Sequence, residues 1–205
     1  MKLKINEFKN HINMNMNKKV TILLSFSISI LSFSQVRIGA INSVGNITNT
    51  SVLLEFGTDN DKGIILPYVE ILPSGTNNSK GGTLIFDVSV NSEYKIKVKN
   101  ENTGWTDLSI QSGYSAAVQN VVKTPQALPL IDQSGAKAVI GDANTTTDGV
   151  LVLNSSDKAM VLPIVSSYTQ IKNPSPGMVA FLQGTNAGEH RLIVFNGQKW
   201  TFWKP

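Results

Sequence analysis

Two stretches of the sequence share one pattern: Asp61-Lys62-Gly63-Ile64-Ile65-Leu66-Pro67 and Asp157-Lys158-Ala159-Met160-Val161-Leu162-Pro163. Each is a polar turn followed by three apolar residues and a proline, which ends a strand because it cannot donate a ladder hydrogen bond. The replacement of Gly63 by Ala159 means that a positive φ is not required in both copies, since alanine resists it. We interpret residues 64–66 and 160–162 as the central buried strands of two β units.

Four further matches flank these stretches in the same order, which indicates an internal duplication. They pair Val36–Gly39 with Ala138–Gly141, Ser51–Phe56 with Gly149–Asn154, Gly82–Phe86 with Gly177–Phe181, and Tyr94–Trp105 with His190–Trp200. The apolar runs are short and separated by Gly, Asn and Asp, which is typical of an all-β protein. The pattern predicts unit 1 at residues 35–108, a linker at 109–137 with one β-like piece at 118–122, and unit 2 at 138–205. Two small sandwiches, one shared and interlocked core, or chains that complete each other all fit the pattern.

Each unit is expected to end in a hairpin that leads to a tryptophan. Asn196-Gly197 is a strong turn signal, because type I′ turns require positive φ values. In the last strand, period-two alternation puts Trp200 and Phe202 on one face and Trp203 on the other. If Trp200 faces the core, Trp203 is expected to face solvent or a partner.

The first 34 residues have the pattern of a cleavable signal peptide, which would form a helix that is removed on export. Lys18 and Lys19 precede an apolar run at 20–31, and Ser32 and Ser34 supply a small-x-small exit. The run is shorter than the roughly 20 residues of a membrane-spanning helix, so no retained span is expected. Residues 1–15 are interpreted as an upstream extension, with Met16 as an alternative start. These features predict a secreted or cell-surface protein, with the periplasm as an alternative location.

Removal of this leader changes the charge of the protein. It takes away five lysines and one glutamate, so the totals of 18 basic and 14 acidic residues become 13 of each. The sequence pI of 9.2 therefore comes mostly from the leader. A neutral mature chain gives no reason to expect a nucleic-acid partner. The absence of cysteine excludes thiol chemistry and lipid attachment at a lipobox.

No motif in the sequence indicates catalysis or a cofactor, so a non-enzyme is predicted. His190 is the one histidine of the predicted mature chain, and it has no Ser-His-Asp motif around it. Asp59 and Asp61 are a weak calcium candidate, since their oxygens are two residues apart beside a glycine, but no bidentate acid follows. The remaining alternative for catalysis is a secreted hydrolase, which would need two acids in one cleft.

Four aromatic residues are candidates for stacking on sugar rings, which would make the chain a carbohydrate-binding module. They are Trp203, Tyr68, Tyr114 and Tyr168. For each of them, ordinary packing or a lone surface aromatic is the competing interpretation.

The matched segments resemble those of exported repeat-containing surface proteins of the Bacteroidota, which include tail-fibre-like and adhesin-like β units. The resemblance is carried by Ile38-Gly39, Leu54-Glu55-Phe56, Asp61–Pro67, Gly82–Phe86 and Asn196–Trp200. It implies export and a non-catalytic structural or adhesion role, within a fibre-like surface assembly, and it transfers no catalytic residues. The chain departs from the family pattern after each Leu-Pro, where Tyr68 and Ile164 stand in place of the usual arginine. A homo-oligomer, with a trimer as the specific guess, and a surface glycan or protein partner are the expected partners.

Overall fold

The computed structural model describes residues 35–39, 51–56, 61–75, 80–126 and 136–203, and residues 35–205 form one compact unit. The predicted signal helix at residues 1–34 lies outside the described residues. Within the described part of the chain, no helix has the length and apolar character needed to cross a membrane.

The predicted all-β class is confirmed, since strands make up most of the regular structure in the described residues. The strands are β1 (Val36–Ile38), β2 (Val52–Phe56), β3 (Ile64–Ile65), β4 (Tyr68–Val69), β5 (Leu84–Asp87), β6 (Lys95–Asn100), β7 (Gly104–Asp107), β8 (Ala138–Gly141), β9 (Leu151–Asn154), β10 (Ala159–Val161), β11 (Ile164–Val165), β12 (Met178–Leu182), β13 (Arg191–Phe195) and β14 (Trp200–Trp203). One α-helix, α2 (Ala116–Gln126), and two 3₁₀ turns, η1 (Tyr168–Gln170) and η2 (Ala187–Glu189), complete the described elements.

Two of the sheets have the same topology. One has the order β4-β5-β6-β7 and the other the order β11-β12-β13-β14. In each, the first pair is parallel and the next two pairs are antiparallel. The registers also agree, because Tyr68 lies opposite Phe86 and Ile164 lies opposite Phe181.

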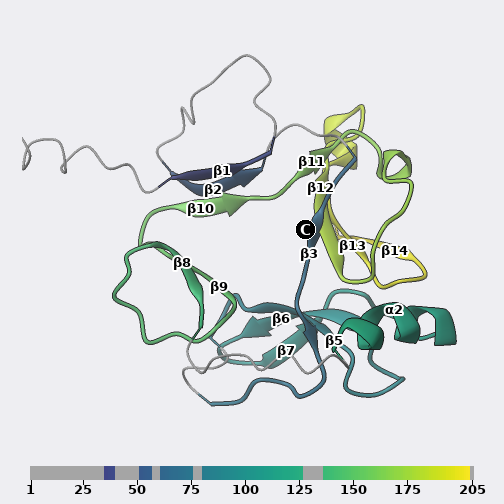
Figure 1. The fold of residues 1–205 in the computed structure, drawn as a ribbon. Coiled ribbons are helices and arrows are strands. Elements are labelled where there is room, and N and C mark those ends of the chain that lie inside the picture. Colours follow the sequence, from purple (N-terminus) through teal and green to yellow (C-terminus); the bar gives the residue numbers. More distant parts are fainter. Residues whose placement is uncertain (1–34, 40–50, 57–60, 76–79, 127–135, 204–205) are drawn as a thin grey trace, which may run out of the picture. The chain divides into compact units, whose positions relative to one another are not determined.

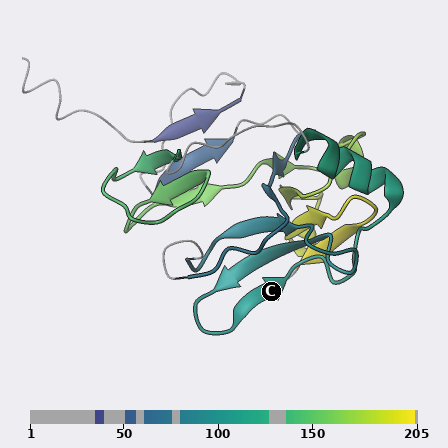
Figure 2. The same ribbon diagram turned by 60° about the horizontal axis from the view of Figure 1, so that its bottom comes forward.

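Strands cross between the first and second halves of the chain. β10 joins β1 and β2 as the third strand of a parallel sheet, with Met160 opposite Leu54. In the other direction, β3 pairs antiparallel with β12, with Ile64 opposite Val179. Both pairings can be followed in Figures 1 and 2, where β10 lies beside β2 and β3 beside β12. The halves are therefore interlocked.

This arrangement corrects the expectation that residues 64–66 and 160–162 are central buried strands. β10 is an edge strand of its sheet, and β3 pairs only with β12 among the described strands. Ile65 is 50% exposed, whereas Leu66 is buried. Each of the two strands is short, and the strand that follows it after the proline belongs to a different sheet: β3 and β11 lie in one sheet, β4 and β10 in two others.

The main hydrophobic cluster draws on both halves of the chain. Phe86, Tyr94 and Ile96 of the first half pack with Val179 and Val194 of the second. On β12 the side chains alternate, so that Met178, Ala180 and Leu182 pack in a second cluster with Trp200 at its edge. A strand that is buried on both faces reads as a continuous apolar run, which explains the sequence of β12.

Helix α2 was missed, because residues 118–122 were expected to be β-like and residues 109–137 a linker. Val118 and Val122 are buried in the main cluster, and their i, i+4 spacing places them on one helical face. Valine has a low intrinsic helix propensity, so the helix depends on this packing. Ser115 caps its start, since its Oγ accepts from the Val118 N–H at 3.2 Å.

The predicted hairpin at Asn196-Gly197 is present, and it is held by the start of the predicted linker. The Asn196 Oδ1 accepts from the Lys199 N–H at 2.8 Å and closes the turn, and its Nδ2 donates to the Gln111 carbonyl at 2.9 Å. Gly113 lies so close that a Cβ there would stand 1.7 Å from the Asn196 carbonyl oxygen. The Gln198 Nε2 donates to the Gly113 carbonyl at 3.1 Å.

Candidate functional site

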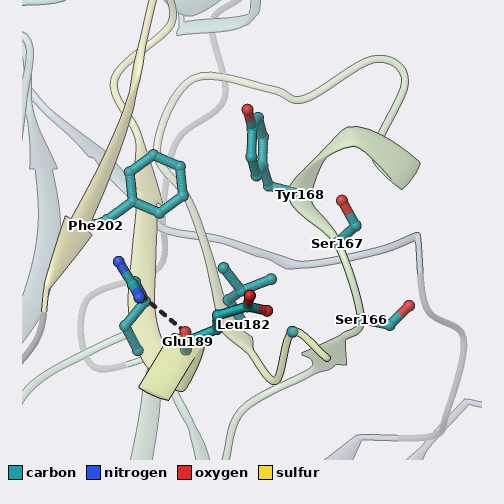
Figure 3. A pocket seen from close by; sticks show the side chains of 8 residues that line it. Ser166, Ser167, Tyr168, Leu182, Glu189 and Phe202 are labelled. Atoms are coloured by element: carbon teal, nitrogen blue, oxygen red, sulfur yellow. Dashed lines mark hydrogen bonds between the residues drawn. The ribbon is translucent and has the colours of Figure 1, made fainter. Parts of the chain in front are cut away.

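A cavity of about 310 Å³ opens between the segment after β11, the loop before β13 and the last strand. Its lining combines aromatic, charged and hydroxyl side chains, as Figure 3 shows. The lining residues are Ser166, Ser167, Tyr168, Leu182, Gly184, Glu189, Arg191 and Phe202. All of them belong to the second half of the chain.

The aromatic side of the cavity is built around Tyr168, which is 40% exposed. Its ring lies 5.2 Å from that of Phe202 at an interplanar angle of 75°, and 6.4 Å from that of Trp200. Ser167 starts the 3₁₀ turn that carries the tyrosine, since its Oγ accepts from the Thr169 N–H. The contacts of Tyr168 with both Trp200 and Phe202 confirm that these two residues share a face of β14.

Glu189 forms the polar wall of the cavity and orders the loop before β13. Its Oε2 accepts from the Thr185 N–H at 2.7 Å and from the Thr185 hydroxyl, and its Oε1 accepts from Asn186 Nδ2. The Thr185 N–H above all, with the Asn186 amide, lowers the pKa of Glu189, because these donors favour the charged carboxylate. Gly184 has φ +62°, and a Cβ there would lie 2.2 Å from Glu189 Oε2.

Arg191 is held beside this loop by backbone carbonyls. Its Nε donates to the Glu189 carbonyl at 2.8 Å, and its Nη2 donates to the Gly188 carbonyl at 3.0 Å. The guanidinium has five N–H donors, so part of its capacity remains for a ligand oxygen. The position of this charge is therefore fixed by the fold before any ligand arrives.

This combination is suited to holding a polyhydroxylated ligand. The aromatic rings offer flat apolar surface, Glu189 accepts hydrogen bonds and Arg191 donates them. Among the described residues that line the cavity, Glu189 is the only carboxylate, whereas canonical glycoside hydrolysis uses two acids that flank the bond.

Of the four aromatic residues proposed for sugar stacking, only Tyr168 lies at this cavity. Tyr68 packs on Phe86 and donates its hydroxyl to the Pro176 carbonyl at 3.1 Å, and burial raises its pKa. Tyr114 packs against the buried ring of Tyr94, with ring centroids 5.2 Å apart. Both are half-buried members of the main cluster.

Trp203 does not face solvent as a free aromatic. It packs against the main hydrophobic cluster and donates its Nε1–H to the Leu108 carbonyl. Period-two alternation correctly places it opposite Trp200, but the other face of β14 is covered by the first half of the chain. Trp203 was expected to face solvent or a partner, and it instead packs on the main cluster of its own chain, which local sequence does not reveal.

The weak calcium candidate receives no structural support. Asp59 lies outside the described residues, and Asp61 is exposed with its carboxylate 3.5 Å from Lys62 Nζ. Among the described residues, no group of three His, Cys, Asp or Glu side chains is arranged to hold a metal ion. His190 is exposed, and its ring lies 6.0 Å from that of Phe181.

Glu189, Arg191 and the two serines were missed by the sequence analysis. Their spacing carries no known motif, and they meet because β11 and β13 flank β12 in one sheet. For Phe202 the sequence did carry a signal, because alternation along β14 placed it on the same face as Trp200. Comparison with known proteins found no matching family model, no significantly similar curated sequence and no significantly similar solved structure.

Proposed function

We propose that the chain is a non-catalytic structural or adhesion module that is exported to the cell surface or beyond it. The observation that carries this proposal is the crossing of β3 and β10 between the halves of the chain. Both copies of the Asp-Lys-x-x-x-Leu-Pro stretch contribute to sheet pairing, so the duplicated feature is used for construction. The common topology of the β4–β7 and β11–β14 sheets supports the duplication that the sequence indicates.

An adhesion assay tests this function. The full chain is exported from a Gram-negative host, and the purified product is coupled to fluorescent beads. The beads should be retained on mucin-, chitin- or collagen-coated glass at least several-fold better than albumin-coated beads. Release of soluble fragments from these polymers without bead retention would favour the hydrolase alternative and overturn the proposal.

Surface location has its own test. Protease added to intact exporting cells should remove an epitope tag on the chain, while a periplasmic marker stays intact. Protection of the tag until the outer membrane is broken would place the protein in the periplasm instead.

A carbohydrate-binding module is the second candidate function, and the exposed ring of Tyr168 above the cavity favours it. On a glycan array the purified protein should bind a defined set of glycans. The Tyr168→Ala variant should bind roughly fivefold more weakly, since a ring contact contributes about 1 kcal/mol. Ile71→Ala is the matched control, because Ile71 is 86% exposed and is not part of the cavity lining. Equal binding by both variants would exclude this site.

A further inference from the structure

The pairing between the two halves of the chain is head-to-tail. In the proposed duplication, β3 corresponds to β10, β2 to β9, and β5 to β12. β10 pairs with β2, whereas its counterpart β3 pairs with β12, and β2 and β12 are not counterparts of each other. Such a contact is heterologous, since it joins two different surfaces of the two units. The first unit therefore keeps one surface of this kind unused, the second unit keeps the complementary one, and each can make the same pairing again.

The first unmatched edge belongs to β9. Among the described strands, β9 pairs only with β8, whereas β2 lies between β1 and β10. The Val150 carbonyl accepts from the Ala138 N–H, and the Asn154 carbonyl accepts from the Asp142 N–H. By alternation, Leu151 and Leu153 direct their N–H and C=O groups to the opposite edge of the strand. This edge is a template for a further strand.

Side chains near β9 are more exposed than those of its counterpart β2, as expected if β9 lacks a neighbouring strand. In the strand registers, Leu54 lies opposite Val36 and Leu151 lies opposite Ala138. The registers therefore make Leu54 and Leu151 counterparts, whereas the sequence alignment pairs Leu54 with Val152, one residue further on. Leu54 is 0% exposed and Leu151 is 47% exposed. Val150, which precedes it, is 71% exposed. Val152 of β9 is buried, so the open apolar surface consists of Leu151 and the preceding Val150, whereas Val52, Leu53 and Leu54 of β2 are all buried.

The second unmatched edge belongs to the start of β5. On β12, β11 covers Phe181 and Leu182, and β3 covers Met178 and Val179. On β5, β4 covers Phe86 and Asp87 in the same way. Leu84, the counterpart of Val179, pairs with Val98 of β6 on one side, and on the other side of β5 no described strand lies beside it.

We propose that a second copy of this chain fills both edges. β9 of one copy pairs in parallel with β3 of the next, and β10 of the first copy pairs antiparallel with the start of β5. These two contacts between copies repeat the two strand pairings seen inside the chain. The proposal rests on the structural role proposed above. Because the contact is heterologous, the copies form a closed ring or an open fibre.

Two variants block the two sides of the proposed contact between copies. Val150→Lys places a charge at the β9 edge, and Ile65→Lys places one on β3, where the side chain is 50% exposed. Ile71→Lys is the matched control, because Ile71 is 86% exposed and lies on none of these strands. The full chain is exported from a Gram-negative host, and its product is studied by analytical ultracentrifugation. Wild type and the control should assemble, and both blocking variants should associate at least tenfold more weakly.

An equimolar mixture of the two blocking variants provides the sharpest result. Each variant keeps one intact end, so the mixture should form a heterodimer that either variant alone cannot form. A wild type that stays monomeric up to 1 mM, blocking variants that still assemble, or a mixture that stays monomeric would overturn the proposal. A monomeric wild type whose beads still adhere would reject the assembly and leave the proposed function standing.

Hydrogen exchange gives a readout that needs no variant. In the wild type, the amides of Leu151 and Leu153 should become protected as the protein concentration rises. Amides of β13, which pairs on both sides within the chain, should not change. Concentration-independent exchange at Leu151 and Leu153 would also overturn the proposal.

Discussion

Replacement of Asp87 by asparagine should destabilise the protein far more than the same change at Asp107. Both aspartates pair with lysines of β6, and both accept a hydrogen bond from the N–H of a serine two residues on. The Asp87 side chain is 0% exposed, with Oδ2 2.7 Å from Lys97 Nζ. The Asp107 side chain is 30% exposed, with Oδ2 2.9 Å from Lys95 Nζ. Burial is therefore the main difference between the two pairs.

The expected magnitudes follow from this difference. Removal of one partner from a buried ion pair costs about 3–5 kcal/mol, because it leaves a buried charge uncompensated. Lys97 keeps a second partner, Glu93 Oε2 at 2.6 Å, so we expect about 3 kcal/mol for Asp87→Asn. A partly exposed pair contributes about 0.5 kcal/mol, which is the expectation for Asp107→Asn. Urea unfolding at pH 7 measures both values, and equal losses in the two variants would refute the reasoning.

The cost of Asp87→Asn should also depend on pH. Burial alone would raise the pKa of Asp87, but the hydrogen bonds from Lys97 and Ser89 outweigh it and lower the pKa. The contribution is then fully present above the unfolded pKa of about 3.9 and is lost as pH falls through the folded pKa. For Lys97, burial would lower the pKa, but Asp87 and Glu93 outweigh it and raise the pKa. Its contribution is present below about pH 10.4 and is lost as pH rises through the folded pKa.

Two further substitutions test the core and the cavity. Tyr94→Phe should raise the free energy of unfolding by about 1 kcal/mol, since the buried Tyr94 hydroxyl has no hydrogen-bond partner among the described residues; a loss in urea unfolding would contradict this. Gly184→Ala should cost about 1–2 kcal/mol because of its left-handed φ. It should also weaken glycan binding, because the new Cβ displaces the Glu189 carboxylate; unchanged stability and binding would show that the loop adapts.

The sequence was sufficient for the fold class and for several local features. Short apolar runs predicted strands, and Asn196-Gly197 predicted a hairpin that the structure contains. Alternation along β14 put Trp200 and Trp203 on opposite faces, which the two hydrophobic clusters confirm. These features depend on backbone periodicity and turn chemistry, which act between neighbours in the sequence.

Features that depend on distant partners were not predicted. Helix α2 is built on valines of low helix propensity, and only its packing against strands of both halves explains it. Trp203 was expected to face solvent or a partner. Its hydrogen-bond partner is the Leu108 carbonyl, almost a hundred positions earlier, which no local pattern indicates. The cavity was missed for the same reason, since Tyr168, Glu189 and Phe202 converge through sheet order.

The crossing of strands makes the two halves dependent on each other. β3 has two residues, and a strand of this length contributes little without a sheet that accepts it. The main cluster mixes Phe86 and Ile96 of one half with Val179 and Val194 of the other, so separation of the halves would expose apolar surface on both. We therefore expect residues 35–205 to unfold in one cooperative transition.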